Sequence, residues 1–208
     1  MTNYYLIRHA HVDYDPPAQI TAHNPLTPLG HEMAALLAER CATMGLQHLF
    51  VSTMRRTQET AAPISAALPD LPRLDMPEMQ ETSIADLAGY PGELPSEDLR
   101  TWKDAHYAYA NESMWARVRA GWDQVQHIAQ ERDLERVGIV THGGPINALL
   151  RHFMGEDGVV RLRICWIDLD WSAVSCLREN GARRSVRFVN DARHIDPLRE
   201  RIPPDPFE

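Results

Sequence analysis

Compact apolar runs alternate along the chain with longer segments in which apolar residues recur every three or four positions. The compact runs predict buried strands, and the longer segments predict helices that bury one face. Buried strands are predicted at residues 4–7, 49–51 and 137–140. Helices are predicted at residues 33–41, 53–67 and 112–130, and from Pro145 onward. This alternation of strands and helices is typical of an α/β fold.

The remaining segments predict less regular structure and a closing set of strands. Residues 68–111 are expected to form an irregular excursion on the substrate side of the sheet, because much of this stretch is rich in proline. An arginine-rich stretch around Asn180-Gly181 predicts a solvated hairpin turn. Two or three closing strands are predicted at residues 164–169, 173–177 and 186–189.

Together these elements predict an α/β three-layer sandwich, in which helices cover both faces of a mostly parallel central sheet. The length of 208 residues favours a single domain over residues 1–208, with the irregular excursion as an insertion into it.

Composition narrows the classes of partner. The 29 acidic residues outnumber the 21 lysines and arginines, and the net charge of −8 argues against a general nucleic-acid or anionic-membrane binder. The three cysteines are scattered, which predicts neither a disulfide framework nor a zinc site. No segment approaches the roughly 18 apolar residues of a membrane span. We therefore expect a reduced, cytoplasmic setting, no metal site and no membrane partner.

Polar and charged side chains follow three of the predicted strands at the point where each ends. They are Arg8-His9, Ser52 with Arg55-Arg56, and Thr141-His142. Because the carboxyl ends of neighbouring parallel strands meet at one edge of a sheet, we expect these groups to converge. Arginine forks bind phosphate oxygens, and a neutral imidazole can attack phosphorus to form a covalent intermediate. A leaving alkoxide also needs a carboxylic acid nearby as proton donor.

Five segments, found in the right order, resemble the motifs of the histidine phosphatase superfamily, which is also called phosphoglycerate mutase-like. They are Leu6-Ile7-Arg8-His9-Ala10, Leu26-Thr27-Pro28-Leu29-Gly30, the segment from Ser52 to Ala61, Val140-Thr141-His142-Gly143-Gly144 and Asn190-Asp191-Ala192-Arg193-His194. The resemblance extends over residues 4–194. It implies a phosphatase or mutase that works through phosphohistidine and needs no cofactor.

The resemblance implies a role for each matching residue. His9 is expected to be the nucleophile, and His142 is expected to bind the phosphoryl group and stabilise its charge. Arg8 and Arg56 are expected to be phosphate ligands. The family's Leu-x-Glu, followed by Gly eight residues later, matches Met79-Gln80-Glu81 with Gly89. Glu81 is therefore assigned as the proton donor. The alternatives are Glu78 and Asp86.

Several residues near these motifs carry less defined expectations. Gly143 and His11 are assigned to substrate binding, whereas Arg55 is expected at the rim of the site. His194 is expected to pack near the site. Asp15 stands where the family commonly has Asn, and an ionised Asp cannot donate a hydrogen bond to phosphate.

The sequence thus predicts a metal-independent phosphomonoesterase that acts on a small phosphorylated metabolite. One alternative is a phosphoglycerate mutase, which returns the phosphoryl group to another oxygen of the substrate. The other alternative is a catalytically silent member that only binds a phosphorylated ligand. The expected partner is the small phosphorylated substrate, and a homodimer is left open.

Overall fold

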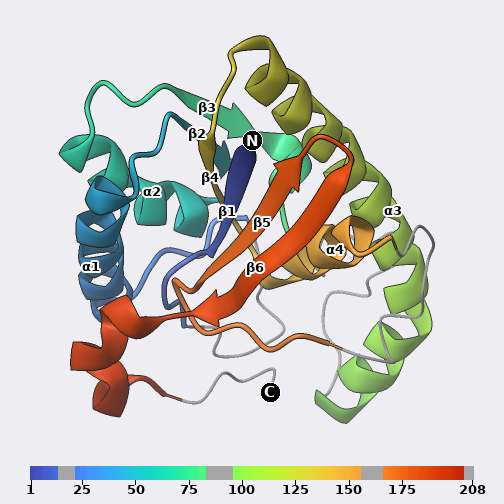
Figure 1. The fold of residues 1–208 in the computed structure, drawn as a ribbon. Coiled ribbons are helices and arrows are strands. Elements are labelled where there is room, and N and C mark those ends of the chain that lie inside the picture. Colours follow the sequence, from blue (N-terminus) through green and yellow to red (C-terminus); the bar gives the residue numbers. More distant parts are fainter. Residues whose placement is uncertain (14–21, 83–95, 156–165, 204–208) are drawn as a thin grey trace.

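A computed structural model describes residues 1–13, 22–82, 96–155 and 166–203, with the backbone alone described for residues 96–112. The strands are β1 (Thr2–Arg8), β2 (His48–Ser52), β3 (Arg73–Met76), β4 (Arg136–Thr141), β5 (Val174–Asn180) and β6 (Arg183–Asp191). They form one sheet in the order β3-β2-β4-β1-β5-β6 (Figure 1). Neighbouring strands from β3 to β1 are parallel, whereas β5 and β6 are antiparallel to their neighbours. The predicted α/β fold with a mostly parallel sheet is confirmed.

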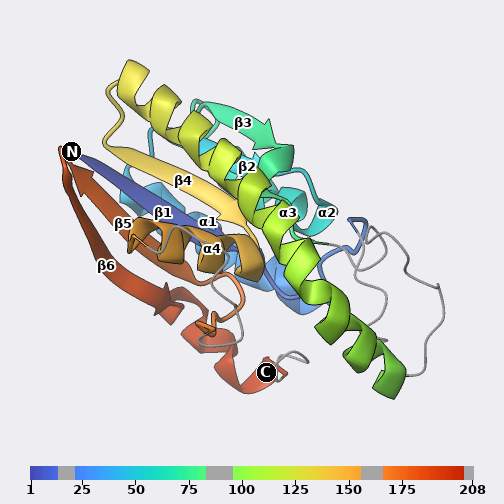
Figure 2. The same cartoon turned by 90° about the vertical axis from the view of Figure 1, so that its right-hand side faces the viewer.

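Helices cover both faces of this sheet. They are α1 (Pro28–Met44), α2 (Arg55–Ala67), α3 (Ser96–Glu131) and α4 (Gly143–Phe153), with short 3-10 helices η2 (Pro77–Met79) and η4 (Arg193–Arg201). Figure 2 shows α3 and α4 together on one face, and α1 and α2 pack on the other. Successive strand residues serve opposite faces: Leu6 joins the core under α3 and α4, and Ile7 joins the core under α1 and α2. The sandwich therefore has three layers.

Helix α1 begins where the sequence carries strong helix-start residues. The Thr27 hydroxyl accepts a hydrogen bond of 3.0 Å from the Gly30 N–H, and Pro28 occupies the first turn. The helix ends at Met44 and is capped by Gly45, whose φ of 64° is the left-handed conformation that glycine adopts without strain. The N–H of Thr27 donates to the carbonyl of His11 at 3.1 Å, which ties the start of α1 to the segment that follows β1.

The stretch predicted to be irregular, residues 68–111, is more regular than expected. Arg73–Met76 forms the edge strand β3, and α3 begins at Ser96 rather than near residue 112. Ser96 follows Pro95 and precedes two acidic residues, a pattern that favours a helix start. Residues 83–95 of the excursion lie outside the described part of the chain.

The strand predicted at 164–169 is wrong for its described part, because residues 166–169 are not in a strand. There the Asn147 side chain of α4 forms the backbone hydrogen bonds that a neighbouring strand would otherwise form. Its amide donates to the carbonyl of Ile167 at 3.0 Å and its oxygen accepts from the N–H of Ile167 at 2.9 Å. The hairpin at Asn180-Gly181 is confirmed, with Gly181 at a φ of 58° between β5 and β6. Among the described helices, none is long and apolar enough to cross a membrane.

Candidate active site

The carboxyl ends of β1, β2 and β4 meet at one edge of the sheet. Arg8 lies opposite Thr141 in the parallel pairing of β1 with β4, and the N–H of His9 donates to the Thr141 carbonyl at 2.9 Å. Strand β2 lies on the other side of β4 and ends at Ser52. The convergence predicted from the strand ends is therefore observed: the two histidine rings, from positions 9 and 142, have centroids 5.2 Å apart.

The contacts of His9 define which of its nitrogens can react. Its Nδ1 lies 2.8 Å from the carbonyl oxygen of Ala10. A carbonyl can only accept, so Nδ1 carries the proton and Nε2 keeps its lone pair. The side chain is buried, at 3% exposed. Burial, followed by the charges of Arg56 and Arg8, holds the pKa of His9 well below its usual 6.5. The imidazole is therefore neutral and carries an unprotonated Nε2 at neutral pH.

His142 is held by a hydrogen bond at each ring nitrogen. The Nε–H of Arg56 donates to its Nδ1 at 3.2 Å, so the proton of the neutral ring sits on Nε2 and points to the Ser52 hydroxyl, 2.8 Å away. His142 and Arg56 are both fully buried. Burial, the Arg56 charge and the neighbouring His9 keep the pKa of His142 well below 6.5. The second histidine is thus a neutral, rigidly oriented partner of a buried cation.

Arg8 is oriented by an aromatic side chain that sequence reasoning missed. Its guanidinium carbon lies 3.9 Å from the ring centroid of Trp171, and its NH1 group donates to the Leu169 carbonyl. The same indole packs against His9, with 5.3 Å between the two ring centroids. Trp171 belongs to none of the five motifs. Because a tryptophan next to a strand is equally typical of core packing, the sequence did not indicate a role in the site.

Glu81 lies at the amino end of α4, next to the second histidine. One carboxylate oxygen accepts from the Gly144 N–H at 2.8 Å, and the other accepts from the N–H of Thr82 at 3.1 Å. The amino end of a helix favours a negative group, so this position suits a carboxylate. Of the two alternative acids, Glu78 packs against α3 at Gly121, and Asp86 lies outside the described residues. The geometry therefore favours Glu81 over Glu78.

Arg117 of α3 is a second residue that the sequence did not reveal. Its guanidinium donates to the backbone carbonyls of Pro77 at 3.2 Å and Glu78 at 2.7 Å. Burial lowers its pKa, while the charge of Glu81 and then that of Glu78 favour its protonated form. Its charge also contributes to the lowered pKa of His142. Arg117 thus fastens the segment that carries Glu81 to α3, although no motif marks it.

Substrate binding by His11 and Gly143 stays a prediction, and the structure shows where these two residues lie. The Nδ1 of His11 lies 2.7 Å from the Thr27 hydroxyl, and its ring meets the edge of Trp171 at 5.4 Å. Gly143 is the first residue of α4, and a Cβ there would lie 4.0 Å from Nε of Arg8. Arg55 is exposed and pairs with Glu59 at 2.7 Å, consistent with the rim. Asp15 lies outside the described residues.

Comparison with known proteins decides the family. A model of the histidine phosphatase superfamily (branch 1) matches residues 4–192. The chain belongs to this superfamily. It is 30% identical over 156 residues to a probable phosphatase of Schizosaccharomyces pombe, with 74% of each chain covered. It is 26% identical over 213 residues to a probable phosphoglycerate mutase, GpmB, of Yersinia pestis, covering 94% of this chain and 96% of that protein.

Solved structures show the same fold. YhfR of Bacillus stearothermophilus superposes with a TM-score of 0.76 at 21% identity, over 94% of this chain and all of that chain. The superfamily member described here is accordingly an enzyme of the phosphatase and mutase kind. The relatives include both activities, so membership alone does not identify the reaction or the substrate.

The contact between Gly144 and Glu81 gives a test of this site. A Cβ at position 144 would come within 2.9 Å of the Glu81 carboxyl carbon. We expect Gly144→Ala to displace the carboxylate and lower kcat by about 100-fold, the scale of a 1 Å misplacement. Because alanine favours helices, the melting temperature should not fall. In a Glu81→Gln background the same substitution should cost nothing further, and a full additional loss would contradict the contact.

Proposed function

We propose that this enzyme is a metal-independent phosphomonoesterase that acts on a small phosphorylated metabolite through a phosphohistidine intermediate. The observation that supports this most is the buried, neutral His9, whose Nδ1 is committed to a backbone carbonyl and whose Nε2 therefore carries the lone pair. A second neutral histidine and two arginines surround it. This set offers a nucleophile and positive charge at the same place.

In the first step Nε2 of His9 attacks phosphorus, and the bond from phosphorus to the ester oxygen breaks with its electron pair on that oxygen. Glu81, in its protonated form, transfers a proton to this leaving oxygen, so an alcohol departs. The charge on the transferring phosphoryl group is balanced by the arginine side chains at positions 8 and 56. His142 holds Arg56 in place, because its Nδ1 accepts a hydrogen bond from the Nε–H of Arg56.

In the second step a water molecule attacks the phosphorus of phosphohistidine. The ionised Glu81 accepts a proton from this water, the bond between phosphorus and Nε2 of His9 breaks, and inorganic phosphate leaves. Both groups thereby return to their starting states. Because no step uses a metal ion, turnover should be unchanged by EDTA across a panel of sugar phosphates, nucleotides and phosphoglycerates. Loss of activity in EDTA that added divalent ions restore would contradict the proposal.

A phosphoglycerate mutase is the second candidate, and the likeness to GpmB over nearly its whole length favours keeping it. A mutase shares the first step but returns the phosphoryl group to a different substrate oxygen before water attacks. A coupled assay of 3-phosphoglycerate interconversion, with the bisphosphate activator present, separates the two. Isomerisation that outpaces phosphate release would assign the mutase, and the reverse is expected.

The acid role of Glu81 predicts a dependence on the leaving group. Glu81→Gln should lower kcat by about 100-fold for an alkyl phosphate, because general acid help is worth this much. With p-nitrophenyl phosphate, whose leaving oxygen needs little protonation, formation of phosphohistidine should be much less affected. The matched control is Glu78→Gln, a nearby carboxylate that packs on α3. A leaving-group dependence in the control and none in Glu81→Gln would reassign the acid.

A further inference from the structure

Trp171 contacts three residues of the site with one indole. The guanidinium of Arg8 lies over its ring at 3.9 Å, and the rings of His9 and His11 lie 5.3 and 5.4 Å from it. The indole itself is only 3% exposed. It therefore fills the space beside the nucleophile and offers the face of an aromatic ring to a cation.

These contacts have two physical consequences. A guanidinium over an indole face is attracted to it, most strongly where water is excluded, and the arginine loses rotational freedom. The indole also covers His9, and burial is the largest cause of the lowered pKa of this histidine. Among the described residues, the charged and titratable side chains recorded as acting on or contacting His9 are Arg56, Arg8, His11 and His142. None of these polar groups can exclude water from His9 as the apolar indole does.

The loop that carries Trp171 is fastened to the end of β1 by two backbone hydrogen bonds directly after the indole. The N–H of Ser172 donates to the carbonyl of His9 at 3.1 Å, and the N–H of Arg8 donates to the carbonyl of Ala173 at 3.0 Å. Ser172 is fully buried and has a φ of 56°, which a side-chain-bearing residue rarely adopts. Such a conformation persists only where surrounding contacts impose it.

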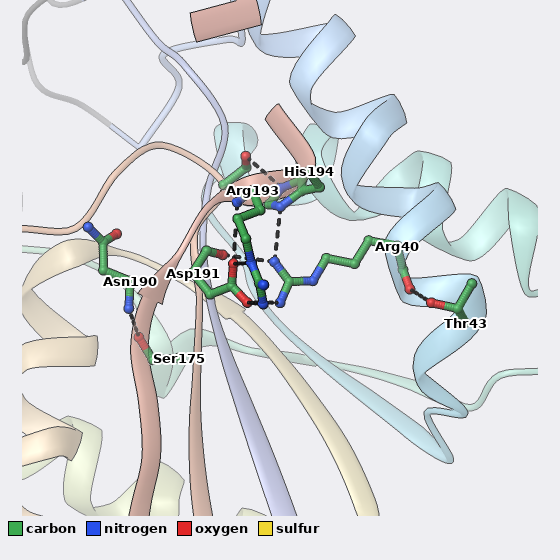
Figure 3. Close-up of polar contacts among 8 residues, drawn as sticks. Arg40, Thr43, Ser175, Asn190, Asp191, Arg193 and His194 are labelled. Atoms are coloured by element: carbon green, nitrogen blue, oxygen red, sulfur yellow. Dashed lines mark hydrogen bonds and ion pairs between the residues drawn. The ribbon is translucent and has the colours of Figure 1, made fainter. Parts of the chain in front are cut away.

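The closing segment of the chain supplies those contacts. His194 accepts a hydrogen bond of 3.1 Å from Arg40 at Nδ1 (Figure 3). Its Nε2–H therefore points to the Ser172 hydroxyl, 3.1 Å away. Asp191 pairs with Arg40 at 3.0 Å, and the Asn190 side chain accepts from the Asp170 N–H at 2.7 Å. Burial and the Arg40 charge lower the pKa of His194 to about 4, which keeps it neutral between these partners.

We propose that Trp171 is a positioning residue of the phosphoryl site, which fixes the guanidinium of Arg8 and shields His9 from water, and that residues 190–194 hold the indole in that place. The inference rests on the proposed function for its effect on turnover. It gives the Asn-Asp-x-x-His segment of this chain a physical task, namely to brace the loop at residues 170–173.

The experiment compares Trp171→Leu and Trp171→Phe with the wild type. Loss of the indole face should lower kcat/KM by about 30-fold in Trp171→Leu, the scale of a desolvated cation–π contact, and less in Trp171→Phe. Inhibition by orthovanadate should weaken in parallel. Water admitted beside His9 should raise its pKa toward 6.5, so the acid limb of kcat/KM should move to higher pH in Trp171→Leu. His194→Ala should move it in the same direction by a smaller amount.

Trp122→Phe is the matched control for lost packing. Trp122 is equally buried but packs against Tyr4 and Phe153 in the core. We expect this variant to lower the melting temperature while leaving the acid limb and the vanadate inhibition constant as in the wild type. If Trp171→Leu fails to fold, Trp171→Phe and His194→Ala carry the same comparison.

Two readouts separate this inference from the proposed function. The pKa of His9 can be followed by long-range ¹H–¹⁵N NMR of the histidine rings, with His9→Ala to assign the signal, and this needs no turnover. An unshifted His9 pKa and unchanged vanadate binding in Trp171→Leu would overturn the inference even in an active enzyme. Shifted values in a protein without phosphatase activity would support it while the proposed function fails.

Discussion

Replacing His9 by alanine is expected to reduce kcat for an aryl phosphate by about 10⁴-fold or more, the scale on which loss of a covalent nucleophile is felt. The reason is that His142, the neutral imidazole next to His9, has both ring nitrogens in hydrogen bonds, Nδ1 with Arg56 and Nε2 with Ser52. Arg56 and His142 keep their mutual hydrogen bond in this variant. Phosphate and vanadate should therefore still bind, and the loss should fall on kcat. Steady-state kinetics and an inhibition constant for phosphate measure both effects.

A matched control separates catalysis from folding. His48 is as buried as His9 but stands at the opposite end of the sheet, at the first residue of β2. His48→Leu should keep wild-type activity. Free imidazole added to His9→Gly should restore part of the phosphoryl transfer, because it can occupy the vacated space. Activity of His9→Ala within tenfold of the wild type would contradict the role of this residue.

Removing the buried guanidinium of Arg56 is expected to have the next largest effect. Arg56→Met should lower kcat/KM by up to about 10³-fold, as found when a preorganised donor to a developing negative charge is removed. Arg56→Lys should fall between this variant and the wild type, because lysine keeps the charge but loses the planar guanidinium fork, whose Nε–H donates to Nδ1 of His142. Inhibition by orthovanadate measures the lost anion affinity directly.

The same variant has a signature in its pH dependence. The Arg56 charge helps to keep the pKa of His9 and His142 below 6.5. Without this charge both values should rise toward 6.5, so the acid limb of kcat/KM should move to higher pH. Circular dichroism and the melting temperature establish that the protein is folded. If Arg56→Met folds but keeps wild-type vanadate affinity and an unmoved acid limb, the role of Arg56 in the site is contradicted.

The parts of the site that follow strand ends were predictable, because parallel pairing dictates where carboxyl ends meet. Arg8, His9 and His142 required only the strand positions and the assumption of parallel neighbours, which the sheet order bears out. Arg117 and Trp171 were not predictable in this way. Their positions depend on how α3 and the segment after residue 165 fold over the sheet, and neither follows from local spacing.

The wrong predictions in the fold have two physical causes. In one, a side chain takes the place of a neighbouring strand, and in the other, a strand lies at the edge of the sheet. An apolar run at residues 164–169 reads as a strand, but in its described part the amide of Asn147 pairs with the backbone of Ile167 instead. Strand β3 is short and lies at the edge of the sheet, so it lacks the continuous apolar run of a buried strand. Only tertiary contacts distinguish these cases.

The most direct test of the account is to trap the phosphoenzyme and locate its phosphoryl group. Glu81→Gln is mixed with p-nitrophenyl phosphate and quenched in base, where phosphohistidine survives, and its peptides are analysed by mass spectrometry. We predict a phosphoryl group on His9 that accumulates because the water step is slowed, and none in the His9→Ala, Glu81→Gln double variant. Completion of the first turnover with no phosphorylated His9 at any time, or with the phosphoryl group on another residue, would contradict the account.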